Sequence, residues 1–202
     1  MTIENYPARD RAAWLAIRKQ DVTASEVAAL FGAHPYKSPL QLFADKTGRS
    51  VETADNKAMR RGRILEPAIA ECWFEEYGER LEKCTDYLRC TVRRIGATPD
   101  YVRGNGEPVE AKSVAPEKWA EWGEQPPFAY TLQALMQAML MDAPRAWLAI
   151  MVDNRAKDFY RFEVPRHPAA EAKMVERVAA FWRAVAADEM PPADYSKDGA
   201  AL

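Results

Sequence analysis

The segment Ala97-Thr-Pro-Asp-Tyr-Val-Arg-Gly-Asn-Gly-Glu-Pro-Val-Glu-Ala-Lys-Ser113 places a glycine-rich turn between two strand-like stretches. Alternate residues of a strand share a face, so we expect Glu110 and Lys112 to point the same way. A three-residue loop at Gly104-Asn105-Gly106 would put Asp100 directly opposite Glu110, whereas a two-residue turn would point Asp100 away. We expect the three-residue loop. Two carboxylates beside a lysine suit a hard cation and an activated water, and the alternative is a charged surface hairpin.

A third carboxylate, Glu66, lies in a long helical pattern over residues 56–77. Residues three or four apart form one face of that pattern: Met59, Gly62, Glu66, Ile69 and Trp73. A charged carboxylate on an inward face is costly unless it is paired or bound to a metal. Metal ligation explains this placement best, but Arg63 could pair with Glu66, or Pro67 could end the helix and leave Glu66 near the surface.

The hydrophobic period and the capping residues predict the remaining elements. Helices are expected over residues 10–20, 24–31, 38–48, 56–77, 116–123, 128–141 and 169–187, with a kink or restart at Pro67. Strands are expected over residues 80–92, 94–103, 107–114, 146–153 and 158–164. This order predicts an α/β (α+β) fold with a mixed central β-sheet flanked by helices, and 202 residues favour one domain over residues 1–202.

Composition excludes several classes of function. The chain has 28 lysines and arginines and 30 aspartates and glutamates, so its net charge is −2. It therefore cannot bind a polyanion through an overall positive charge, but only through a local basic surface. The three cysteines form no CxxC pair, which indicates reduced thiols and excludes a four-cysteine metal site. His34 and His167 each precede a proline and are expected to be loop residues. The longest apolar run, residues 146–152, is too short to cross a membrane, and we expect a cytoplasmic protein without a signal peptide.

The spacing from Pro99-Asp100 to Glu110-Ala-Lys112 matches the PD-(D/E)xK nuclease signature. Around it lie five further blocks: Trp14-Leu-Ala-Ile-Arg18, Thr23-Ala-Ser25-Glu26, Phe31-Gly-Ala-His-Pro-Tyr-Lys-Ser-Pro39, Arg61-Gly-Arg-Ile-Leu-Glu-Pro67 and Tyr130-Thr-Leu-Gln133. In this order the blocks resemble the YqaJ-type viral recombinase family, which includes the lambda phage exonuclease and related alkaline exonucleases. The resemblance covers roughly residues 11–153.

The resemblance implies a restriction-endonuclease-like core and a Mg²⁺-dependent 5′→3′ exonuclease on double-stranded DNA. Such an enzyme releases mononucleotides and leaves a 3′ single-stranded tail for a single-strand annealing protein. It also implies a ring-shaped homotrimer, up to two Mg²⁺ ions per site with Mn²⁺ as a substitute, and a bacterial or prophage source.

The resemblance also assigns roles to individual residues. Glu66, Asp100, Glu110 and the Ala111 carbonyl match the metal ligands, and Lys112 matches the lysine that positions and helps deprotonate the attacking water. Tyr130 and Gln133 match an active-site tyrosine and glutamine, and Arg18 and Ser25 match residues that bind the DNA 5′ phosphate.

Several of these roles also follow from the residues. Tyr130, Gln133 and Gln137 share a polar stripe on their helix, which a metal–phosphate site would satisfy, and Gln137 is a candidate contact with the DNA backbone. Ser25 lies at the start of a helix capped by Thr23, where free N–H groups favour a phosphate, although Ser25 could instead simply support the cap. An arginine cluster is the other candidate for DNA backbone contact, with a solvated helix face as its alternative: Arg60, Arg61 and Arg63.

Two other functions stay open at this point. The same scaffold could serve a repair or site-specific endonuclease, although no long insertion offers base-reading loops. A non-catalytic module that binds DNA ends would not need all three carboxylates and Lys112.

Overall fold

The computed structural model describes residues 1–7, 10–50, 57–153 and 158–198. Its helices are α1 (Arg11–Arg18), the 3-10 helix η1 (Val27–Phe31), α2 (Pro39–Thr47), α3 (Lys57–Tyr77), α4 (Pro116–Glu121), α5 (Phe128–Leu140) and α6 (Pro168–Ala187). Its strands are β1 (Glu4–Pro7), β2 (Val22–Thr23), β3 (Glu82–Lys83), β4 (Asp86–Cys90), β5 (Ile95–Ala97), β6 (Tyr101–Val102), β7 (Pro108–Val114), β8 (Arg145–Val152) and β9 (Phe159–Pro165).

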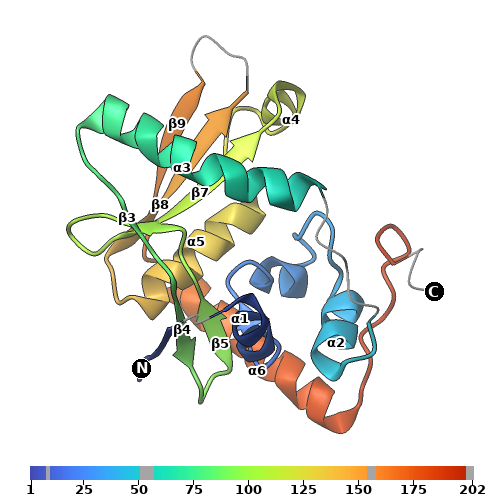
Figure 1. The fold of residues 1–202 in the computed structure, drawn as a ribbon. Coiled ribbons are helices and arrows are strands. Elements are labelled where there is room, and N and C mark those ends of the chain that lie inside the picture. Colours follow the sequence, from blue (N-terminus) through green and yellow to red (C-terminus); the bar gives the residue numbers. More distant parts are fainter. Residues whose placement is uncertain (8–9, 51–56, 154–157, 199–202) are drawn as a thin grey trace.

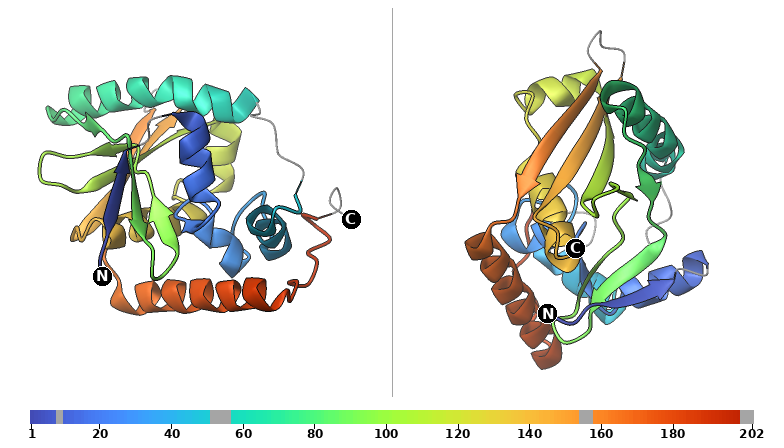
Figure 2. Two further views of the ribbon diagram at one scale, coloured as in Figure 1. Left: turned by 60° about the horizontal axis from the view of Figure 1, so that its bottom comes forward. Right: turned by 90° about the vertical axis from the view of Figure 1, so that its left-hand side faces the viewer.

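A five-stranded mixed sheet, ordered β3-β6-β7-β8-β9, lies between α3 and α5 (Figure 1). Strands β7 and β8 are parallel and the other pairs are antiparallel. On one face, Ile69 and Trp73 of α3 pack with Val109 and Ala111 of β7. On the other face, α5 packs in the main core, and α6 lies on the side of the molecule opposite α3 (Figure 2). Glu110 and Lys112 therefore point toward α5.

The turn between β6 and β7 is the predicted three-residue loop. Tyr101 pairs with Val109 and Val102 with Pro108, and the Arg103 N–H donates to the Glu107 carbonyl at 2.9 Å. Gly106 has a φ of +85°, which glycine adopts without strain. This register, extended by one residue, brings Asp100 level with Glu110.

The strands before this hairpin differ from the prediction, because the described residues form a second, four-stranded sheet ordered β1-β4-β5-β2. Residues 80–92 divide into β3 and β4, and residues 94–103 divide into β5 and β6, so each pair contributes to both sheets. Pro99 lies at the second break, where its missing N–H cannot continue a ladder. The short strands β1 and β2 were not predicted.

A close packing contact joins β4 and β5 in this second sheet. Arg89 of β4 pairs with Gly96 of β5, and a Cβ atom on Gly96 would lie 2.1 Å from the Tyr87 hydroxyl oxygen. That hydroxyl donates to the buried carboxylate of Asp21, which Arg89 also contacts. Only glycine leaves room for this arrangement.

The helices mostly follow the prediction, with three corrections. The expected helix after Thr23 is the short 3-10 helix η1, so Ser25 precedes a 3-10 turn rather than lying in the first turn of an α-helix. Pro67 neither ends nor restarts α3, which runs continuously through it. Met59 is 54% exposed, so the inward face of α3 begins only after its first turns.

Two expectations from composition agree with the structure. The three cysteine thiols are free, with Cys90 buried and Cys72 and Cys84 half-buried. None of the helices in the described part of the chain has the length and apolar character needed to cross a membrane.

Candidate active site

Glu110 is a buried carboxylate in the middle strand of the five-stranded sheet. Its side chain is held by donors from two elements. Lys112 Nζ lies 2.5 Å from Glu110 Oε1, as expected for residues on one face of β7. Gln133 Nε2 donates to the same oxygen at 2.6 Å, and Gln137 Nε2 donates to Oε2 at 2.6 Å. Strand β7 and helix α5 thus fix this carboxylate in one orientation.

The side-chain amides of Gln133 and Gln137 on α5 donate to Glu110, and for Gln137 this differs from the prediction. Gln137 is only 1% exposed, and this burial is incompatible with the expected contact with a DNA backbone. Its amide instead orients Glu110, and its Oε1 has no hydrogen-bond partner among the described residues. Gln133 is also buried, whereas Tyr130, one turn earlier, is half-buried.

Asp100 lies beside Glu110, as the loop geometry predicts. Its Oδ2 accepts the Ala111 N–H at 2.8 Å, which ties the carboxylate to β7. Burial, and next the neighbouring charge of Glu110, raise the pKa of Asp100 well above its ordinary value. The ammonium of Lys112 lowers the pKa of Asp100 in turn, but it does not outweigh burial and the charge of Glu110.

Lys112 is a charged lysine with limited exposure. Burial alone would lower the pKa of Lys112, but Glu110 and then Asp100 outweigh burial and raise it. The ammonium also lies 5.0 Å from the centre of the Tyr130 ring, a cation–π distance. Tyr130 in turn packs edge-on against Trp122 at 5.5 Å. Lys112 is therefore protonated at neutral pH and restrained on both sides.

Glu66 does not join the other two carboxylates in the structure. It is half-buried on α3, which covers the opposite face of β7 from Glu110, and Lys83 Nζ lies 2.5 Å from Glu66 Oε2. Among the described residues, no group of three His, Cys, Asp or Glu side chains is gathered to hold a metal ion. Glu66 thus pairs with Lys83, and α3 continues past Pro67 rather than ending there.

The chemistry of the donor set nevertheless fits a hard divalent ion. Asp100 and Glu110 offer carboxylate oxygens, which Mg²⁺ and Mn²⁺ prefer to nitrogen or sulfur. Burial, and next the charge of Glu110, raise the pKa of Asp100, and a bound cation would favour its ionised form. Asp100, Glu110 and the Ala111 carbonyl are the donors that would hold such an ion, with Glu66 available only if it leaves Lys83.

Arg18 and Ser25, predicted to bind a phosphate, are brought together. Arg18 Nη2 donates to Ser25 Oγ at 3.1 Å and lies 3.5 Å from Thr23 Oγ1. The guanidinium stacks 4.1 Å from the centre of the Trp14 ring, and that stacking restrains it.

Glu26 lies close to three cations, Arg18 included, and we call Glu26, Arg18, Lys37 and Lys46 the Glu26 cluster. Lys46 contacts Glu26 at 2.7 Å and Lys37 contacts it at 3.2 Å. Burial would raise the pKa of Glu26, but Lys46, Lys37 and Arg18 prevail and lower it to about 2. Asp45 also contacts Lys37, at 2.6 Å, so three cations face two carboxylates and one positive charge is left over. This excess suits an anion better than the predicted helix start, because η1 is too short to supply such a site.

The arginine cluster of Arg60, Arg61 and Arg63 lies exposed on the early turns of α3. Arg61 forms an ion pair with Asp153 at the end of β8. Their exposure leaves these side chains in position to meet a polyanion.

Sequence reasoning missed Lys37, Lys46 and Lys83. Lys46 and Lys83 meet their partners only through the tertiary fold, so no local pattern reveals them. His34 lies in a loop, as predicted. Its Nδ1 accepts the Tyr36 N–H, and burial, followed by the charge of Lys37, lowers the pKa of its imidazole to about 4. His34 is therefore neutral at physiological pH.

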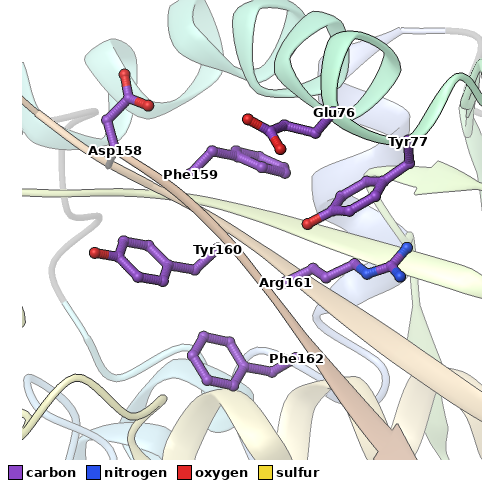
Figure 3. Close-up of a pocket in the computed structure, with 7 residues that line it drawn as sticks. All are labelled: Glu76, Tyr77, Asp158, Phe159, Tyr160, Arg161 and Phe162. Atoms are coloured by element: carbon purple, nitrogen blue, oxygen red, sulfur yellow. The ribbon is translucent and has the colours of Figure 1, made fainter. Parts of the chain in front are cut away.

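A separate pocket of about 450 Å³ lies between the end of α3 and strand β9 (Figure 3). Glu76 and Tyr77 line it together with residues 158–162, and the Arg161 guanidinium stacks 3.7 Å from the Tyr77 ring centre. None of the residues predicted to act on a substrate lines this pocket. It is distinct from the carboxylate pair and from the Glu26 cluster.

Residues 13–143 match the family described as YqaJ-like viral recombinase domain. The YqaJ protein of Bacillus subtilis (strain 168) is 27% identical over 127 residues, which cover 61% of this chain and 40% of that protein. The chain thus matches less than half the length of this relative.

Solved structures share the fold. The alkaline exonuclease LHK-Exo of Laribacter hongkongensis, also solved in complex with dAMP, has a TM-score of 0.70 and 24% identity over 94% of this chain and 98% of its own. A phage-related exonuclease from Haemophilus somnus 129PT has a TM-score of 0.63 and 13% identity over 82% and 93% of the two chains. These likenesses confirm the predicted fold class, a mixed β-sheet flanked by helices.

Proposed function

Because the chain belongs to the YqaJ-like viral recombinase family, we propose that it is a divalent-metal-dependent nuclease that degrades double-stranded DNA from its ends. The proposed reaction is 5′→3′ hydrolysis to mononucleotides, which leaves a 3′ single-stranded tail for a strand-annealing protein. The arrangement of Asp100, Glu110 and Lys112 around one hairpin is the observation that carries this proposal. The dAMP bound by LHK-Exo is compatible with a mononucleotide product.

Each residue of the hairpin has a distinct part in the proposed mechanism. A bound Mg²⁺ or Mn²⁺ would polarise the scissile phosphate and lower the pKa of a bound water. Glu110 is held ready by Gln133 and Gln137, so it needs no reorientation to accept a cation. Lys112 orients the attacking water and supplies positive charge to the phosphate.

The charge state of Lys112 sets the proposed pH dependence. Glu110 and Asp100 keep its proton on in the metal-free protein. Acting as a base therefore requires a cation at these carboxylates, which removes their hold on the proton. We propose an alkaline optimum, since rising pH increases the fraction of deprotonated Lys112 or of deprotonated water.

The Glu26 cluster is the proposed site for the 5′ phosphate. Arg18 and Ser25 present a guanidinium and a hydroxyl at one point, with Lys37 and Lys46 behind them. A phosphate held there would draw only a 5′-phosphorylated end toward the carboxylate pair. Such a pocket would set the direction of degradation.

We further propose that residues 1–202 form one nuclease domain that assembles into a homotrimeric ring. A chain with a net charge of −2 must concentrate its positive charge to hold DNA, and a ring does so at its centre. The exposed Arg60, Arg61 and Arg63 are the proposed DNA contacts.

Incubation with linear blunt duplex and covalently closed circular DNA, with Mg²⁺ or with EDTA, tests the proposal. An exonuclease consumes only the linear duplex and only with the metal. Cutting of the circle would instead establish an endonuclease. Binding without cutting of either substrate would leave a DNA-end binding module.

A further inference from the structure

Lys83 lies at the edge of the candidate site and has no role in the proposed mechanism. Its Nζ lies 2.5 Å from Glu66 Oε2 and 4.6 Å from the centre of the Tyr101 ring. The side chain remains partly open to solvent, with 45% of its surface exposed.

The backbone fixes Lys83 next to Asp100. Lys83 pairs with Tyr101 across β3 and β6, and the following residue, Cys84, donates its N–H to the Asp100 carbonyl at 3.1 Å. Lys83 consequently interacts electrostatically with both Glu66 and Asp100. One ammonium thus lies within reach of two of the three carboxylates assigned to metal binding.

This placement explains why Glu66 stands apart from the other two carboxylates. The Glu66 oxygen that accepts from Lys83 is not open to a cation, and a divalent ion beside Asp100 would meet the charge of the ammonium. Lys83 therefore opposes metal binding both by occupying a ligand and by repulsion.

Resting on the proposed function, we propose that Lys83 is a positioning residue that holds Glu66 in the metal-free protein and competes with the divalent ion for it. While no metal is bound, Lys83 balances the charge of Glu66 and interacts electrostatically with Asp100. When an ion binds through Glu66, the flexible lysine side chain moves into solvent, which its exposure permits.

The test is Mn²⁺ binding to the intact chain, measured by electron paramagnetic resonance of free Mn²⁺ and by the rise in thermal midpoint on adding Mn²⁺. Lys83→Met keeps the aliphatic stem and removes the charge. We expect its Mn²⁺ dissociation constant to fall by about three- to tenfold, with a larger metal-induced rise in midpoint than in the wild type. Lys83→Arg keeps the charge and should bind as the wild type does.

A matched control separates this effect from a general loss of charge. Lys173 pairs with Glu176 at 2.8 Å on the exposed face of α6, far from the site. Lys173→Met should leave Mn²⁺ affinity unchanged. Equal or weaker Mn²⁺ binding by Lys83→Met than by the wild type, with the protein folded, would overturn the proposal.

The variant Glu66→Gln distinguishes a failure of the role proposed for Lys83 from a failure of the proposed nuclease function. If Glu66→Gln weakens Mn²⁺ binding and Lys83→Met does not tighten it, only the role of Lys83 is wrong. If the wild type binds no Mn²⁺, both proposals fail. In the Glu66→Gln background, Lys83→Met should tighten Mn²⁺ binding less than it does in the wild type, because only the repulsion remains to be relieved; an undiminished gain would show that Lys83 does not act through Glu66 and would overturn the inference.

Discussion

Gln137 donates its side-chain amide to Glu110 at 2.6 Å in the buried layer between α5 and β7. With Gln133 and Lys112 on the other carboxylate oxygen, Glu110 has donors on both sides. A carboxylate whose orientation is fixed by such hydrogen bonds is a better metal ligand than a mobile carboxylate.

Gln137→Met should therefore impair catalysis without any contact between Gln137 and DNA. The substitution nearly conserves volume but removes one donor from Glu110, and loss of such an orienting bond typically costs about 10- to 100-fold in activity or metal affinity. Hydrolysis of linear duplex measures the effect, with thermal unfolding as the check on the fold. Gln41→Met, which loses a bond to the Lys197 carbonyl, is the control and should stay active. Full activity of Gln137→Met would contradict the orienting role.

Lys112→Ala should nearly abolish hydrolysis. Removal of one charged group from a reacting centre commonly costs about 10²–10³ in rate. Lys118→Ala provides the matched control, because Lys118 is an exposed lysine that pairs with the exposed Glu121 on α4. If Lys112→Ala kept more than about half of the wild-type rate, the assigned mechanism would be wrong.

Metal affinity should rise with pH through the neutral range. The raised pKa of Asp100 means that this carboxyl still binds a proton where an ordinary aspartate would not, and an incoming cation must displace it. Calorimetric titration of Mn²⁺ in buffers of different ionisation enthalpy should reveal proton release that declines toward alkaline pH. Affinity independent of pH from about pH 6 to about pH 9 would speak against a protonated Asp100.

Arg18→Ala should slow degradation chiefly on 5′-phosphorylated ends. Arg18 contributes a guanidinium to the Glu26 cluster, and a charged hydrogen bond to phosphate is worth about 1.5–3 kcal/mol, or roughly 10- to 150-fold. Paired duplexes that differ only in a 5′ phosphate or 5′ hydroxyl supply the measurement. Arg80→Ala, which loses an exposed arginine stacked on Phe74, should not change the ratio. An equal loss of rate on both kinds of end would contradict the proposed site for the 5′ phosphate.

The sequence predicted the parts of the site that depend on local geometry. Alternation in β7 placed Glu110 and Lys112 on one face, and the glycines of the loop set the register that brings Asp100 beside them. Both follow from short-range rules of strands and turns.

Long-range contacts escaped the prediction. No pattern in residues 80–103 predicts that β3 and β6 belong to one sheet and that β4 and β5 belong to another. The partner of Glu66 could not be foreseen for the same reason, since Lys83 reaches it only after β3 has paired with β6. The polar stripe predicts a polar partner for Gln137, but no local pattern shows that this partner is Glu110 rather than DNA, because Glu110 lies 27 residues away in the sequence.

The most direct test of the proposed nuclease measures the order in which the two ends of one DNA strand are released. A linear duplex labelled at the 5′ end of a strand and differently at its 3′ end is incubated with the protein and Mg²⁺. The account predicts early release of the 5′ label as a mononucleotide, with the 3′ label kept on long single-stranded DNA, and no release by Asp100→Asn. Release of the 3′ label first, or equal release by Asp100→Asn, would contradict the proposed nuclease.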